Sequence, residues 1–106
     1  MNSEVRVIQP LGRLDVTSAT KFRREITEVA ATKPKYLLID LTDVSFMDSS
    51  GLGALVSALK SIRTVDGDMA ICSLSEQVQM LFELTSMSKI FKIYNDREDF
   101  NASITS

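Results

Sequence analysis

The chain has 106 residues, of which 44% are hydrophobic, and its 12 basic and 14 acidic side chains give a net charge of -2. This length suits one compact domain over residues 1–106, and the near-neutral charge argues against the basic face that nucleic-acid binding needs. The absence of histidine, together with a single cysteine, excludes Ser-His and Cys-His nucleophiles and makes a structural metal site implausible.

The amino end, Met1–Glu4, carries neither the basic nor the apolar region of a secretory signal. No apolar run approaches the ~18 residues that a membrane span needs, so we expect a cytoplasmic protein. Val5–Leu11 begins with alternating apolar and polar residues, which predicts a strand. Pro10 lacks an N–H group, so this strand lies at a sheet edge or ends there. Gly12–Asp15 is expected to form a turn.

A helix is expected next, capped by Asp15 or Thr17 and running to about Ala31, with Pro34 stopping it. Apolar residues recur along it at helical spacing, which predicts one buried face. These residues are Phe22, Ile26, Val29 and Ala30.

Tyr36–Leu41 is a short apolar run, typical of a strand buried on both faces. Asp40 and Asp43, near its end, are interpreted as solvated turn residues. A second stripe with spacing i, i+3, i+4, i+7 and i+10 then predicts a helix beginning near Gly51. Its members are Leu52, Leu55, Val56, Leu59 and Ile62.

The segment between this strand and this helix has unusual chemistry. Asp48, Ser49 and Ser50 can each accept a hydrogen bond from the free N–H groups of a helix's first turn. Gly51 and Gly53 lack a Cβ atom, so a backbone or a phosphate could approach closely. One interpretation is a well-capped helix start, with Ser50 as the N-cap. The other is anion binding or phosphate acceptance at the positive end of the helix dipole.

The second half of the chain continues the alternation of strands and helices. Asp66-Gly67 breaks the chain, and Met69–Leu74 is expected to be a strand in which Cys72 is buried. Strands that alternate with helices predict a mostly parallel sheet with right-handed crossovers.

A third helix is expected after Ser75, which can cap it. Ile90–Tyr94 then predicts a short last strand, and Asp96 can cap a final turn or two that runs through Ile104. The apolar side of the third helix is expected to comprise Val78, Leu81, Phe82 and Leu84.

Common enzymatic motifs are incomplete. No P-loop pattern follows Gly51, and Val56 occupies the place of the third glycine of a dinucleotide fingerprint. A hydrolase elbow around Ser49 would need a glycine where Met47 stands, and a histidine elsewhere. We therefore expect no enzymatic turnover.

A receiver-like domain phosphorylated on aspartate is an alternative, since Asp40 and Asp48 follow or end apolar segments. That chemistry needs an acidic cluster that holds a hard metal ion. The segment after the first strand offers only Asp15, with Arg13 beside it. This alternative is therefore disfavoured.

Three segments resemble one known family. Phe46–Gly53, with its core Asp-Ser-Ser-Gly-Leu-Gly, resembles the signature of the STAS domain, and in particular that of bacterial anti-sigma-factor antagonists. Leu11–Asp15 and Leu81–Tyr94 resemble two further elements of the family. The resemblance implies an α/β fold: a single STAS-like domain, with a small, mostly parallel sheet, an N-terminal edge strand and helices chiefly on one face. The chain departs from the family in two places: Met1–Glu4 is too short for the extra first strand of many relatives, and Ser86 stands where glycine is common.

The resemblance also implies a function as a phosphorylation switch, without catalysis, cofactor or metal. In its unphosphorylated form such a protein binds a serine kinase that is also an anti-sigma factor. The kinase phosphorylates the first serine of the motif, here Ser49, and a serine phosphatase reverses this. The surround of the phosphorylation site, expected to bind the partner, comprises Asp15, Met47, Asp48, Ser50, Gly51, Leu52 and Gly53.

The family leaves alternatives open. STAS domains also serve as subunits of stress-signalling, transporter or lipid-transport complexes, and some bind nucleotides weakly. Which of these partners this chain has does not follow from the motif.

Overall fold

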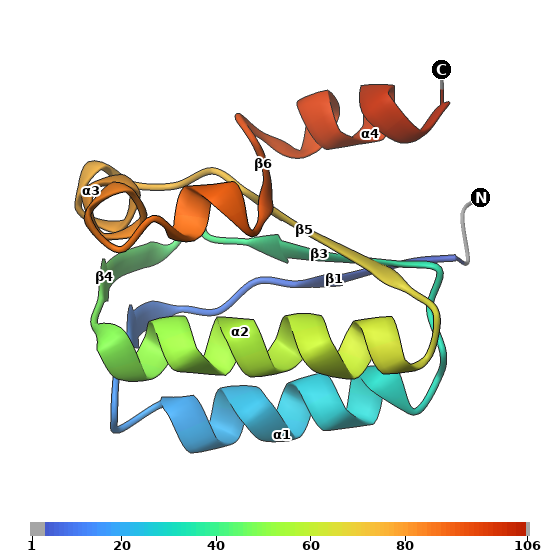
Figure 1. Cartoon of the computed structure of the whole chain (residues 1–106), viewed down its shortest axis with the longest axis horizontal. Coiled ribbons are helices and arrows are strands. Elements are labelled where there is room, and N and C mark those ends of the chain that lie inside the picture. Colours follow the sequence, from blue (N-terminus) through green and yellow to red (C-terminus); the bar gives the residue numbers. More distant parts are fainter. Residues whose placement is uncertain (1–3, 106) are drawn as a thin grey trace.

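The computed structural model describes residues 4–105, and a parallel sheet of four strands runs through its centre (Figure 1). The spatial order is β1-β3-β5-β6, and each neighbouring pair is parallel, with Val7 opposite Leu38 and Leu38 opposite Ala70. The strands are β1 (Val5–Ile8), β3 (Tyr36–Asp40), β5 (Asp68–Cys72) and β6 (Lys92–Tyr94). The predicted parallel sheet, with the N-terminal strand at its edge, is confirmed.

In the part of the chain that the structure describes, four α-helices surround the sheet. Figure 1 shows α1 and α2 side by side below it, α4 above it, and α3 at one end, next to a separate strand pair. The helices are α1 (Ala19–Ala30), α2 (Ser49–Thr64), α3 (Glu76–Leu84) and α4 (Arg97–Thr105), and a short 3-10 helix, η1, spans Met87–Lys89. The strand pair consists of β2 (Gly12–Leu14) and β4 (Val44–Met47), again parallel.

Alternating side chains of β3 explain why Tyr36–Leu41 is apolar throughout. Leu37 and Ile39 belong to the large core beneath α1 and α2, whereas Leu38 belongs to a second cluster on the opposite face. There Phe100 of α4 covers the sheet. Helices thus lie chiefly on one face, as predicted, and α4 closes the other.

Helix α2 buries the apolar stripe that was predicted from Leu52 to Ile62, except that Val56 is only partly buried. The helix begins at Ser49, two residues before the predicted position near Gly51. In α1 the predicted inner face is confirmed, with Ala30 partly buried, but Ser18 occupies the N-cap position, so that neither Asp15 nor Thr17 is the cap.

Two elements were wrongly predicted or missed. Gly12–Leu14 forms strand β2 where a turn was expected, and β4 was not predicted. Both strands are short, and Gly12, with φ +78, has the backbone of a turn residue at the point where the register shifts. Strands of this length leave no measurable alternation in the sequence.

Two side chains lie elsewhere than expected. Leu84 is 79% exposed, because it stands two residues beyond the buried Phe82 and so lies on the other side of α3. Asp40 is only 4% exposed and is therefore not a solvated turn residue. Cys72 is buried, as predicted.

Ser86, which stands where the family commonly has glycine, has a left-handed backbone with φ of 60 and ψ of 18, a conformation that favours glycine. Ser75 caps α3 as predicted, accepting from the Val78 amide. The expectation of a short amino end falls on residues 1–3, which lie outside the described residues. Within residues 4–105, no helix has both the length and the apolar character of a membrane span.

Candidate functional site

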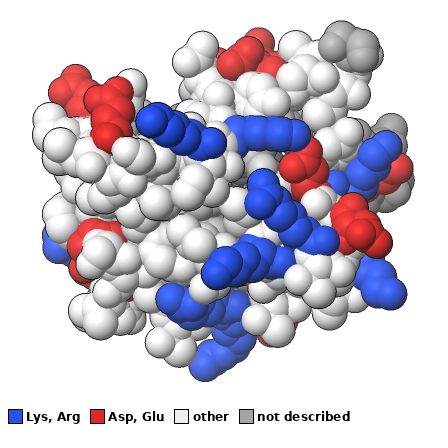
Figure 2. Space-filling model, viewed as in Figure 1, with Lys and Arg blue, Asp and Glu red and all other residues white. Residues whose placement is uncertain are grey.

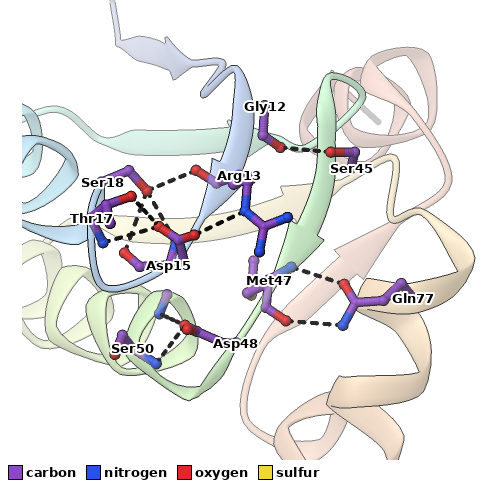
Figure 3. Close-up of polar contacts among 11 residues, drawn as sticks. Gly12, Arg13, Asp15, Thr17, Ser18, Ser45, Met47, Asp48, Ser50 and Gln77 are labelled. Atoms are coloured by element: carbon purple, nitrogen blue, oxygen red, sulfur yellow. Dashed lines mark hydrogen bonds and ion pairs between the residues drawn. The ribbon is translucent and has the colours of Figure 1, made fainter.

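Asp48 is the N-cap of α2. Its backbone is extended, and its Oδ1 accepts hydrogen bonds from the amides of Ser50 at 2.9 Å and Gly51 at 3.1 Å (Figure 3). Ser50 is therefore a first-turn residue and not the cap. The donors that the sequence suggested for an anion are already occupied by the carboxylate of this chain.

Ser49 is the first residue of α2 and its side chain is exposed, whereas Ser50 is half-buried. Within residues 4–105, the Ser49 hydroxyl makes no hydrogen bond to another residue, so it is presented to solvent. Of the two hydroxyls, that of Ser49 is the more accessible to an enzyme.

Strand β2 runs directly behind this helix start. The amide of Asp48 donates to the Leu14 carbonyl at 3.4 Å, which joins the end of β2 to the cap. Gly51 faces the same carbonyl so closely that a Cβ atom there would be 2.1 Å from the oxygen. Gly53 is less confined: a Cβ would meet only Arg23, at 3.8 Å.

Beside the cap, both carboxylate oxygens of Asp15 accept hydrogen bonds from residues close to it in the sequence. It accepts from the Thr17 hydroxyl at 2.6 Å, from the Thr17 amide at 3.0 Å and from Arg13 Nε at 3.0 Å. The Thr17 hydroxyl and the Arg13 guanidinium lower the pKa of Asp15 to about 2, so this carboxylate is charged at neutral pH. Arg13 in turn lies over the Phe46 ring, 4.3 Å from its centre.

The other side of β4 is held by α3. Gln77 Oε1 accepts from the Met47 amide, and Gln77 Nε2 donates to the Met47 carbonyl, both at 2.9 Å (Figure 3). Sequence reasoning missed Gln77, and also Arg13 as a surface group. No local signal could have indicated Gln77, because it bonds a residue 30 positions away.

The structure brings together the residues that were predicted to surround the phosphorylation site, but these residues differ in their exposure to solvent. Ser49 is exposed and Asp48 half-exposed, so both are within reach of a partner. Met47, Gly51 and Leu52 are buried, so their part is to pack the helix start against the core.

The receiver-like alternative finds little support at Asp40. This carboxylate accepts from Arg97 Nε at 2.6 Å and from both the amide and the hydroxyl of Thr42. Burial raises its pKa, but the Thr42 hydroxyl and Arg97 outweigh burial and hold the pKa below its ordinary value. Among residues 4–105, no three acidic or cysteine side chains are placed so that they could hold a metal ion.

Comparison with known proteins accounts for this architecture. A family model described as STAS domain matches residues 1–100. The chain belongs to the STAS domain family. A relative from Listeria monocytogenes, named anti-sigma-B factor antagonist, is 36% identical over 92 residues, covering 87% of this chain and 81% of the relative.

Solved structures share the fold. An anti-sigma factor antagonist from Mycobacterium paratuberculosis superimposes with a TM-score of 0.88 at 24% identity, covering 100% of this chain and 90% of that one. The anti-sigma factor antagonist SpoIIAA in its unphosphorylated form gives 0.73 at 20% identity, with 99% and 92% covered. Its phosphorylated form gives 0.72 at 20% identity, with 97% and 94% covered.

Proposed function

We propose that this chain is an anti-sigma-factor antagonist, a protein-binding switch controlled by phosphorylation of Ser49. Unphosphorylated, it binds a serine kinase that acts as an anti-sigma factor, and phosphorylation by that kinase releases it. A serine phosphatase restores the binding form. The protein works in the cytoplasm and catalyses no reaction itself.

The observation that carries this proposal is the exposed hydroxyl of Ser49 beside the capping carboxylate of Asp48. A phosphoserine adds about -1.5 to -2 charges at neutral pH. Since Asp48 already accepts from the Ser50 and Gly51 amides, a phosphate on Ser49 would stay on the surface beside a like charge. A partner docked there would have to bury both anions, which is unfavourable.

The basic side chains of α2 do not offset this charge. Lys60 and Arg63 lie in the C-terminal half of the helix, where cations complement the dipole, and Ser49 is at the other end. Figure 2 shows Lys and Arg side chains on the upper centre, the centre and the lower part of the visible face, the lowest of them on the side of α1 and α2. The cations that α2 itself carries thus lie at the end of the helix opposite Ser49.

The proposal is tested by incubating the protein with the cognate kinase and ATP, followed by tandem mass spectrometry. We expect phosphate on Ser49. Phosphate on Ser50 alone, or on neither serine, would overturn the assignment. Capture of a transporter subunit in place of a serine kinase from native cytosol would instead favour the transporter alternative.

The absence of catalysis has its own test. The purified chain should not hydrolyse nucleotides, although weak binding of a nucleotide is compatible with the switch. Steady hydrolysis that a Ser49→Ala or Asp48→Asn change abolishes would contradict the proposal.

A further inference from the structure

We infer that Gln77 is a positioning residue for the phosphorylation of Ser49: its side-chain amide sets the backbone that delivers this serine to the kinase. This inference rests on the proposed function. Gln77 belongs to α3, outside the sequence motif, and does not touch Ser49.

The first step is the geometry at the edge of β4. One edge of this strand pairs with β2. At the other edge, Gln77 makes the same pair of hydrogen bonds that a neighbouring strand would make, accepting from the Met47 amide and donating to its carbonyl, both at 2.9 Å. The primary amide is suited to this because it carries an acceptor and a donor side by side.

The second step is burial. Met47 is 1% exposed, so water is poorly placed to replace Gln77 at these two backbone groups. A buried N–H or C=O without a partner is unfavourable, and the strand would move to find one. Gln77 therefore determines where the end of β4 lies.

The third step is the short path to the reacting hydroxyl. Met47 ends β4, Asp48 caps α2 and Ser49 begins α2, so only one residue separates the Gln77 bonds from Ser49. Leu14 holds Asp48 from the β2 side. Within residues 4–105, the helix start is thus fixed from both flanks, by a strand on one and by Gln77 on the other (Figure 3).

Phosphoryl transfer makes this position matter. The attacking hydroxyl oxygen must lie in line with the leaving oxygen of ATP, and catalysis consists largely of that alignment. A displacement of about 1 Å can lower the rate about 100-fold. Loosening the end of β4 should therefore slow phosphorylation even where the domain stays folded.

The experiment compares three variants with the wild type in the presence of the cognate kinase and ATP. Gln77→Met keeps the size of the side chain and removes both hydrogen bonds. Gln79→Met is the matched control on the exposed side of the same helix. We expect Gln77→Met to lower kcat/KM for Ser49 phosphorylation at least tenfold and to speed hydrogen exchange at the Met47 amide, with Gln79→Met unchanged in both.

Gln77→Glu supplies a readout that a purely structural role would not give. The carboxylate can accept from the Met47 amide but opposes the Met47 carbonyl, whereas a protonated carboxyl can bond to both. The rate of Gln77→Glu relative to wild type, measured at each pH, should therefore rise as the pH is lowered toward about 5, approaching the ordinary Glu pKa. Gln77→Met should show no such rise.

The outcomes separate this inference from the proposed function. If the wild type is not phosphorylated on Ser49, the proposed function fails whatever Gln77 does. If the wild type is phosphorylated, and Gln77→Met matches it in rate while remaining folded in thermal melts, the positioning role is wrong. If Gln77→Met does not fold, Gln77→Glu decides, and a relative rate that does not change with pH overturns the inference.

Discussion

The α-carbon of Gly51 lies so close to the carbonyl oxygen of Leu14 that a Cβ atom would come within 2.1 Å of it. Real Cβ atoms do not approach a carbonyl so closely, so the first turn of α2 and the end of β2 can touch only through a glycine. This close approach, together with the hydrogen bond from the Asp48 amide to the Leu14 carbonyl, places the start of α2 beside the residues that follow β2, among them Asp15.

Gly51→Ala should destabilise the protein, because β2 or the helix start must move apart. We expect a loss of about 1–3 kcal/mol in the free energy of unfolding, as for other overpacked sites. Gly53→Ala is the matched control: its Cβ would meet only Arg23, at 3.8 Å, so the helix propensity of alanine should stabilise by about 0.5–1 kcal/mol. Urea denaturation of both variants measures this, and equal effects would contradict the steric explanation.

Ser49→Asp should leave the fold intact and weaken kinase binding. The thermal midpoint should stay within a few degrees of wild type, because the Ser49 side chain is exposed and contributes nothing to the core. Binding should fall at least tenfold, or roughly 1.4 kcal/mol, as a lower bound for phosphate. Ser49→Ala should bind but resist phosphorylation. Calorimetric titration beside thermal melts tests this, and binding lost only through unfolding would contradict a surface block.

Lowering the pH should reduce the free energy of unfolding, partly through protonation of Asp15. The pKa of Asp15 is lowered from 3.8 to about 2 in the folded state, first by the Thr17 hydroxyl and then by Arg13. Its stabilisation is thus complete above pH 3.8 and is lost as the pH falls toward 2. Denaturation series across this pH range measure how the free energy of unfolding declines as the pH falls. Asp15→Asn should make this decline shallower, and Thr17→Val should do so to a smaller extent. Asp40 acts in the same direction, so some decline should remain.

Arg97 should matter more to stability than an ordinary surface cation. Asp40 has a side chain only 6% exposed, and Arg97→Met would remove one of its partners, leaving Thr42. We expect a loss of about 1–3 kcal/mol from the buried acceptor. Lys92→Met is the control, because its ion pair with Asp68 is exposed at 60% and 43% and should be worth about 0–1 kcal/mol. Equal losses by chemical denaturation would show that burial does not decide the difference.

The elements with strong periodicity could be predicted from the sequence, and the short ones could not. The stripe from Leu52 to Ile62 predicts its helix because the core accepts one face of it. Gly12–Leu14 becomes a strand only because Val44–Met47 lies beside it, a tertiary pairing without a local signal. Leu84 shows the reverse case, an apolar residue in a predicted buried stripe that is nevertheless 79% exposed.

At the candidate site, the motif located the helix start, but its chemistry depended on neighbours. Asp48, Ser49 and Ser50 all had the composition of a cap, and only the backbone shows that Asp48 is the one that caps. Asp40 appeared solvated because its partner Arg97 lies 57 positions further along the chain. Contacts between such distant residues follow from the topology and not from spacing.

The position of α4 has a consequence during synthesis. Phe100 packs edge-on against Tyr36 and Tyr94 and covers the face of the sheet that holds Leu38 and Cys72. A ribosome makes α4 after all the strands that it covers. Until α4 emerges, the nascent sheet presents this apolar face to water, where it could associate with other chains or with a chaperone. Synthesis of α4 is therefore the step at which the growing polypeptide becomes able to cover this apolar face.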